Sequence, residues 1–171
     1  NVVGNWEGIL SNQGERIELD DAAGQRIDRV EYADEGDWAQ RAAGPLDRNH
    51  RGWIWDKPHD GLGRSLELRN PYLPNHYGQN WAPSRVAEGT PGAVNSAATA
   101  NVEPFILEAA HFPVVPRAQE PVAITARIFD ERATGLRLTL HYRLDALEPG
   151  PFVAVPMLDD GLQEDGTPGD G

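Results

Sequence analysis

The chain has 171 residues and a formal net charge of −12, with 39% hydrophobic and 25% charged residues, which is typical of a globular protein rather than a disordered one. It contains no cysteine, which excludes disulfides, thiolate zinc sites and cysteine nucleophiles. The acidic balance disfavours nucleic acid as a partner because phosphates would be repelled, and no apolar run approaches the roughly 20 residues that span a bilayer, so membrane insertion is not expected.

Alternating apolar residues predict two β-strands near the start of the chain. Ile17 and Leu19 share one face of the stretch ERIELD, as expected for a strand that is covered on one side. In the stretch RIDRVEY the apolar residues Ile27, Val30 and Tyr32 alternate imperfectly, which favours a β-bulge.

The middle of the first half is less regular. The stretch WAQRAAG, residues 38–44, is compatible with one or two helical turns that Gly44 and the following proline would end. In the stretch RSLEL, Leu66 and Leu68 alternate with Ser65 and Glu67. This pattern predicts a short strand with the two leucines on one face and Ser65 and Glu67 on the other.

Three strands are predicted in the second half, at residues 122–128, 136–143 and 152–157, and Pro156 would confine the last one to a sheet edge. All five Trp precede residue 82 and all four Phe follow residue 104. Because aromatic side chains dominate cores, this segregation predicts two cores. The small, polar residues 93–104 are interpreted as the linker between them. We therefore place one module at residues 1–100 and a second at residues 101–171.

Residues 8–96 resemble the lamin-tail domain of bacterial secreted proteins. The resemblance is carried, in order, by GILSNQGERIELDDAAGQRIDRVEY, Trp38, DGLGRSLELRNP, Asn80-Trp81, Ser84 and GTPGAVNS. Residues 104–171 are similar to the immunoglobulin- or fibronectin-like modules that follow such domains, through PVAITARIFDE, LTLHYRLD and FVAVPMLDDG. These likenesses imply an all-β fold of two tandem immunoglobulin-like β-sandwich modules and an extracellular or cell-surface location.

Both modules are expected to be incomplete at the chain ends. The lamin-tail resemblance implies strands before Gly8 that are not all present. Residues 104–171 provide roughly four strands, whereas a complete sandwich has about seven. We expect the missing strands to come from a longer parent chain or from a neighbouring copy by strand addition.

The segment 63–81 has two interpretations. As a site, it offers Asn75, His76, Tyr77 and Asn80 to a glycan or a metal ion. As a frame, it is a loop shaped by proline and glycine, in which asparagine side chains bond to nearby backbone groups. The abundance of Gly, Asn, Pro and Trp favours the frame. We expect no catalytic activity, because the chain has no Gly-x-Ser-x-Gly elbow and no His-x-x-x-His pair.

Two further groups of residues are candidate ligand sites. Trp53 and Trp55 share a strand face and form either a carbohydrate platform or, as the spacing favours, a stripe of the core. The acidic tail offers hard oxygen ligands of the kind calcium takes, and the alternative is a solvated acidic loop. The candidate calcium ligands are Asp159, Asp160, Asp165 and Asp170.

These observations predict a non-catalytic structural or adhesive module of a larger bacterial surface or secreted protein, which assembles by strand addition. Its partners would be other domains of the parent chain or neighbouring copies. The alternative is an accessory module that binds calcium or carbohydrate and is attached to a secreted enzyme.

Overall fold

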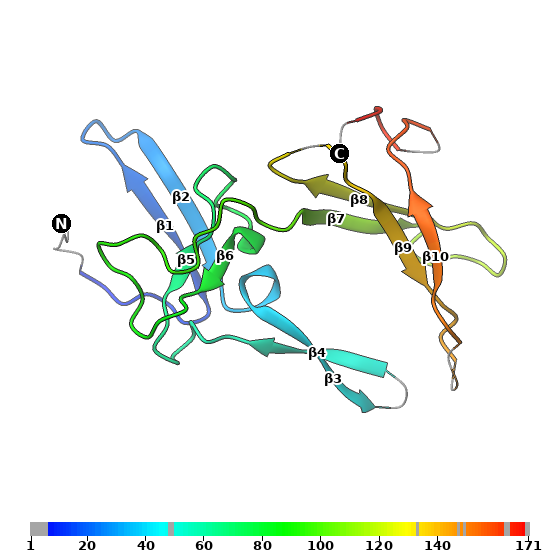
Figure 1. The fold of residues 1–171 in the computed structure, drawn as a ribbon, viewed down its shortest axis with the longest axis horizontal. Helices are drawn as coiled ribbons and strands as arrows, with labels where there is room; N and C mark the ends of the chain where they lie inside the picture. Colours follow the sequence, from blue (N-terminus) through cyan, green and yellow to red (C-terminus); the bar gives the residue numbers. More distant parts are fainter. Residues whose placement is uncertain are drawn as a thin grey trace. The chain divides into compact units, whose positions relative to one another are not determined.

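The computed structural model describes residues 7–47, 50–132, 134–146, 148, 150–162 and 165–169. Contacts divide the chain into two compact units, Asn1–Val102 and Glu103–Gly171, called unit 1 and unit 2 below. The secondary structure of the described residues consists of ten strands and two 3₁₀ turns (Figure 1), so the all-β prediction is confirmed. None of these residues belongs to a helix that is long and apolar enough to cross a bilayer.

Unit 1 contains three antiparallel strand pairs. Its elements in chain order are β1 (Gly14–Asp20), β2 (Arg26–Ala33), η1 (Gly36–Trp38), β3 (Gln40–Asp47), β4 (His50–Asp56), β5 (Leu66–Leu68), η2 (Gly78–Asn80) and β6 (Trp81–Pro83). The pairs are β1–β2, β3–β4 and β5–β6.

The β1–β2 hairpin contains the bulge that the spacing of its apolar residues favours. Leu19 pairs with Asp28, and the next residue of β1 already pairs with Arg26, so Ile27 is the extra residue of the bulge. Ile17 lies directly opposite Val30, which places their side chains on the same face. The hairpin therefore has one apolar face.

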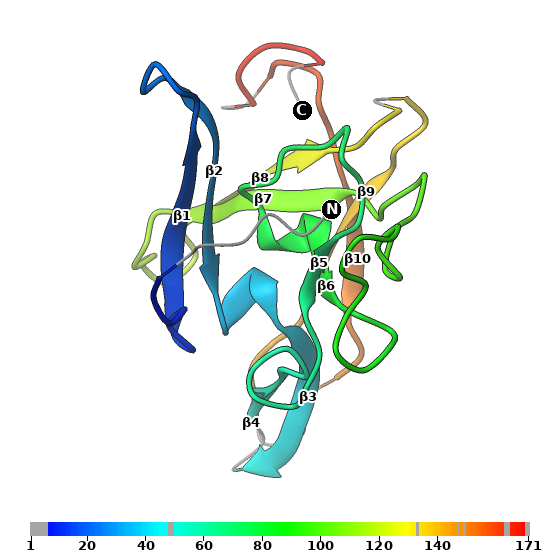
Figure 2. The same cartoon turned by 90° about the vertical axis from the view of Figure 1, so that its left-hand side faces the viewer.

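The prediction of helical turns at residues 38–44 is wrong beyond η1. Gln40 to Ala43 pair in register with Asp56 to Trp53, because the aromatic and β-branched residues of β4 favour a strand and cross-strand contacts outweigh the weak local preference of alanine and glutamine. Gly44 lies at the irregularity in the register rather than at a helix end. In Figures 1 and 2 this hairpin extends away from the rest of unit 1.

The loop between β5 and β6 is held by the buried side chain of Asn80, which is 0% exposed. Its Oδ1 accepts a hydrogen bond from the backbone N–H of Asn70 at 3.0 Å. Its Nδ2 lies 2.9, 3.3 and 3.2 Å from the carbonyl oxygens of Asn70, Leu73 and Pro74. One amide thus satisfies four backbone groups, as the frame interpretation predicts.

Gly78 allows η2 to pack directly on η1. A Cβ atom at this position would lie 2.6 Å from the carbonyl carbon of Asp37 and 2.7 Å from the backbone nitrogen of Trp38, which is too close for any side chain. The contact brings Trp38 near Trp81, with ring centroids 5.8 Å apart. Glycine is therefore required here by close backbone approach.

Glu67 of β5 is buried, although it is an acidic residue that alternates with two leucines. It is 4% exposed, and its carboxylate accepts hydrogen bonds from Thr90 Oγ1, from Ser96 Oγ at 2.8 Å and from the Ala97 N–H at 2.9 Å. The linker interpretation of residues 93–104 is therefore wrong for its first part, which folds onto β5. Glu67 is the more buried residue because residues 90–97 cover the face of β5 on which it lies.

Unit 2 contains two antiparallel strand pairs. They are β7 (Phe105–Phe112) with β8 (Ala123–Phe129), and β9 (Leu138–Tyr142) with β10 (Val153–Met157). Phe105 and Leu107 are buried, whereas Ile106 and Phe112 are 62% and 66% exposed. The apolar surface of β7 is thus only partly covered by the described residues.

We predict that Asn80→Ala lowers the free energy of unfolding of unit 1 by about 3 kcal/mol, because it leaves several buried backbone groups unsatisfied. Asn75→Ala is the matched control, since the Asn75 amide makes an exposed hydrogen bond to Asp28 and its loss should cost less than about 1 kcal/mol. Urea unfolding followed by tryptophan fluorescence measures both. Equal losses would contradict the role assigned to Asn80.

Candidate functional site

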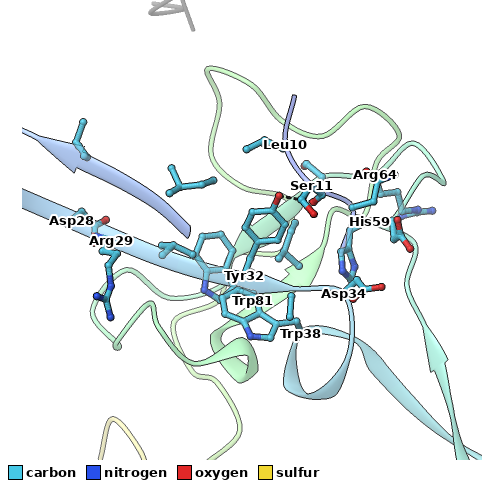
Figure 3. A pocket seen from close by; sticks show the side chains of 18 residues that line it. Leu10, Ser11, Asp28, Arg29, Tyr32, Asp34, Trp38, His59, Arg64 and Trp81 are labelled. Carbon is cyan, nitrogen blue, oxygen red and sulfur yellow. Dashed lines mark hydrogen bonds between the residues drawn. The ribbon is translucent and has the colours of Figure 1, made fainter. Parts of the chain in front are cut away.

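A cavity of about 540 Å³ opens beside the apolar face of the β1–β2 hairpin in unit 1 (Figure 3). Its aliphatic lining comes from both strands of the hairpin, from the segment before β1 and from β5. Ile17 and Leu19 remain 43% and 60% exposed, so the described residues do not cover this face. The aliphatic lining residues are Leu10, Ile17, Leu19, Val30 and Leu66.

Three aromatic rings line the middle of the cavity: Tyr32 at the end of β2, Trp38 of η1 and Trp81 of β6 (Figure 3). The Tyr32 hydroxyl donates a hydrogen bond to the Ser11 carbonyl oxygen at 2.7 Å. The Trp81 Nε1–H donates to the Asn75 carbonyl oxygen at 2.8 Å. These bonds fix the rings, so the aromatic wall is preorganised.

One end of the cavity is polar, and its charges are balanced. Lys57 Nζ lies 2.6 Å from Asp34 Oδ2 and 3.3 Å from Asp60 Oδ2. The hydrogen bond from Lys57 is the main reason that the pKa of Asp34 is lowered. Asp34, Asp60 and Arg64 line the cavity, and Lys57, which is not a lining residue, neutralises the two acids. An uncharged occupant suits this end best, because a charged one would unbalance it.

His59 lies at this polar end, beside Asp34 in Figure 3. Both of its ring nitrogens are shielded from solvent, and neither has a hydrogen-bond partner among the described residues. Burial lowers the pKa of His59, against the opposing effect of Asp60 and Asp34, so the ring is neutral at pH 7. A neutral imidazole offers one N–H donor and one nitrogen acceptor.

The chemistry of these groups suits binding. The hydroxyls of Ser11 and Ser65 line the same cavity, but His59 makes no hydrogen bond to either of them within the described part of the chain. The cavity is an apolar, partly aromatic hollow with polar side chains at one end, which is the usual composition of a binding site.

Trp53 and Trp55 lie on one face of β4, as predicted. The interpretation of this pair as part of the core is wrong for Trp53, whose side chain is 60% exposed. Their partners on β3 are Ala43 and Arg41, and the Arg41 guanidinium carbon lies 5.3 Å from the Trp53 ring centroid. The reason is topological: β3 and β4 form a two-stranded sheet, and such a sheet has little to bury its aromatics against.

The acidic tail folds around its own backbone. Asp165 Oδ2 accepts hydrogen bonds from the N–H groups of Asp160 and Gly161 at 2.6 and 2.8 Å, and Asp159 Oδ1 accepts one from Gly169 N–H at 2.7 Å. Asp170 lies outside the described residues. Within those residues no group of three or more histidine or acidic side chains is arranged to hold a metal ion. Calcium binding by this tail stays a prediction.

The polar residues of the segment 63–81 do not converge on a common site. Asn75 Nδ2 bonds to Asp28 Oδ1 at 2.8 Å, and the rings of His76 and Tyr77 pack on each other with centroids 4.0 Å apart. Asn80 points into the backbone of its own loop. The segment therefore forms a frame, and Arg64, Ser65, Leu66 and Trp81 of the segment line the neighbouring cavity.

Sequence reasoning did not find the cavity, because its lining comes from several separated segments. One signal was available: Ile17, Leu19 and Val30 form an apolar face for which the sequence offers no obvious cover. No sequence pattern indicates that His59 is shielded, because a single histidine forms no motif with a recognisable spacing.

No protein-family model matches the chain, and no curated protein and no solved structure shows significant similarity to it. The likeness to lamin-tail domains therefore stays a prediction. Function is inferred below from the cavity and from the uncovered strand faces.

We predict that stability rises with pH from about pH 5 to about pH 7 through His59. Because the pKa of His59 is lower in the folded chain than the ordinary value of 6.5, the unfolded chain takes up more protons as the pH falls below about 6.5, and the free energy of unfolding decreases. His59→Phe should flatten this part of the profile. Glu67 and Asp34 contribute little to the pH dependence in this range. Their pKa values are lowered in the folded chain, so they change stability at more acidic pH.

Urea unfolding at a series of pH values, on the wild type and His59→Phe, measures the two slopes. Identical slopes in both proteins would contradict the shielding of His59.

Proposed function

We propose that the chain is a pair of immunoglobulin-like β-sandwich modules with a structural or adhesive role in a larger bacterial secreted or surface protein, and that unit 1 binds an added strand. The observation that carries the proposal is the apolar face of β1–β2, which lines a cavity of about 540 Å³ and leaves Leu19 60% exposed. Exposure of such an apolar face to water raises the free energy of the folded chain. A strand that covers the face would remove this unfavourable contribution.

The arrangement of the sheets supports this proposal. Every sheet among the described residues has two strands, whereas sheets of three or more strands, or strands packed on another layer, are the usual stable form. Unit 2 has the same character, with Phe112 and Ile106 largely exposed. Strand addition supplies main-chain hydrogen bonds to a free edge and side chains to an open face.

The donor of the strand is a neighbouring copy of the chain, or another domain of a longer one. Two copies that each carry a net charge of −12 repel each other over distances comparable to the Debye length. Self-association is therefore expected to strengthen as salt is added. A basic domain of the same parent chain would show the opposite dependence.

We predict that the isolated chain self-associates from micromolar to millimolar concentration and that Leu19→Asp weakens the association at least about tenfold, because it places a charge where an apolar side chain is buried. Ile27→Asp is the matched control. Ile27 is 62% exposed on the same hairpin, but it lies at the bulge and does not line the cavity.

Sedimentation velocity at low and high salt measures the association. A monomer at every concentration and salt, or equal effects of the two substitutions, would contradict assembly through this face.

A second candidate function, that of an accessory carbohydrate-binding module, is favoured by the exposure of Trp53. Its ring projects from a hairpin, opposite the small side chain of Ala43, and Arg41 lies over it. An exposed indole next to a hydrogen-bond donor is suited to stacking on a sugar ring. Calcium binding at the tail would fit the same accessory role.

For this candidate we expect Trp53→Ala to weaken glycan binding by about tenfold, while Tyr72→Ala, which removes an aromatic ring that is 92% exposed elsewhere on unit 1, leaves it unchanged. A glycan array followed by calorimetry on the best ligand measures the difference. If no glycan binds the wild type, the candidate is excluded.

A further inference from the structure

The β3–β4 hairpin, called the arm below, exposes apolar side chains on one face. Trp53 is 60% exposed and Leu46 is 58% exposed. Leu46 lies opposite Arg51, which is two residues before Trp53 on β4, so Leu46 and Trp53 share a face. The arm extends away from the rest of unit 1 in Figures 1 and 2, and none of its described residues lines the cavity beside β1–β2. The apolar face of the arm is therefore open to another molecule.

The charged side chains on this face of the arm are both basic among the described residues. Arg41 lies opposite Trp55, and Arg51 lies two residues from Trp53 on β4, so alternation places both arginines on the face of Trp53. The Arg41 guanidinium carbon lies 5.3 Å from the Trp53 ring centroid. The face thus has an apolar centre and a base at each end. The acids of the arm belong to its opposite face, and they are Asp47 and Asp56.

The apolar face of β1–β2 has an acid at each end. Ile17 and Val30 form its central pair. Glu15 lies two residues from Ile17 on one side, and on the other side Leu19 lies opposite Asp28. Alternation therefore places Glu15 and Asp28 on the apolar face. The bases of the hairpin belong to the opposite face, where ion pairs join some of them to Glu18 and Asp20; these bases are Arg16, Arg26 and Arg29.

The two faces match in spacing as well as in sign. The positions of the two acids are four residues apart along β1, because Asp28 is opposite Leu19. The positions of the two arginines are four residues apart along β4, because Arg41 is opposite Trp55. At roughly 3.3 Å per residue, each separation is about 13 Å along the strand. Opposite charges that meet at both ends of a contact fix its register and orientation.

The cavity beside the apolar face is suited to the Trp53 ring. Its volume of about 540 Å³ lies within the range of roughly 300–1,000 Å³ that is usual for binding pockets. Its acids Asp34 and Asp60 are neutralised by Lys57, so an uncharged indole enters without disturbing the balance of charge. Tryptophan is also a frequent anchor at the centre of protein interfaces, where it fills a pocket on the partner.

We propose that the strand which covers the apolar face is β4 of a neighbouring copy, and that its Trp53 enters the cavity. Arg41 and Arg51 of the arm then lie over the two acids of the face. This inference rests on the proposed function, since it names the donor of the added strand. The contact joins two different surfaces, so copies add head to tail into rings or filaments. Repulsion between whole copies still opposes contact at low salt, whereas the local charges select which surfaces meet.

Two variants that each disable one surface test this contact. Trp53→Ala removes the anchor of the arm and leaves the face intact. Leu19→Arg places a cation on the face that receives the arginines and leaves the arm intact. By sedimentation velocity, each variant alone should self-associate at least about tenfold more weakly than the wild type. An equimolar mixture should regain the affinity of the wild-type contact and stop at a one-to-one dimer, because the remaining arm and face are disabled.

Ile54→Ala is the matched control. Ile54 is 53% exposed but lies on the other face of β4, next to Trp53 in the chain, so its loss should leave association unchanged. Circular dichroism shows that each variant is folded. If Trp53→Ala is not folded, Arg51→Glu takes its place, because it disables the same face of the arm at an exposed position.

The outcomes separate this inference from the proposed function. A mixture that is no larger than its folded components overturns the contact between arm and face. Wild-type association of Trp53→Ala, together with weak association of Leu19→Asp, also overturns it and leaves the proposed function standing with another strand as donor. A wild type that is monomeric at every concentration and salt, or association that Leu19→Asp does not weaken, contradicts assembly through this face and with it the proposed function.

Discussion

The fold of unit 1 depends on hydrogen bonds to a few buried polar side chains rather than on a large apolar core. Glu67 and Asn80 are nearly inaccessible, and each bonds to several groups of a loop that passes over β5 or β6. Buried polar networks of this kind specify one arrangement strongly when every member is satisfied. These hydrogen bonds also explain how β5 and β6, which have only three residues each, hold the surrounding loops in place.

A polar frame has a consequence for the apolar residues. The buried hydrophobic residues of unit 1 are only Leu73, Ala97 and Val102 among those the structure describes, and none of them belongs to β1 or β2. The apolar face of that hairpin is therefore not part of the core that the loops close. It lines a cavity instead. The apolar residues of β1 and β2 therefore remain partly exposed in the described part of the chain.

The sequence predicts the features that depend on local pattern. Strand periodicity identified β1 and β2, and the irregular spacing around Ile27 identified the bulge, because alternation reports directly which side chains share a face. The frame role of Asn80 followed from the turn chemistry of its loop. The all-β class needed only these signals and the scarcity of helical patterns.

The features that depend on distant contacts were not predictable in the same way. Residues 40–43 have no strong preference of their own and become a strand because residues 53–56 pair with them. Glu67 looked solvent-facing, since an acidic residue between two leucines usually is, and only the three donors from residues 90–97 make its burial favourable. The linker interpretation failed for the same reason. The cavity is assembled from several such segments, so no single stretch reports it.

Among the described residues of unit 1, His59 is an exception to the satisfied polar frame. Its shielding comes from its surroundings at the polar end of the cavity, where Lys57 joins Asp34 and Asp60, and these ion pairs leave the imidazole itself without a partner in the described chain. A chain that needed only stability would gain from an apolar residue here. The satisfied side chains of Glu67 and Asn80, and not His59, therefore hold the loops of unit 1 in place.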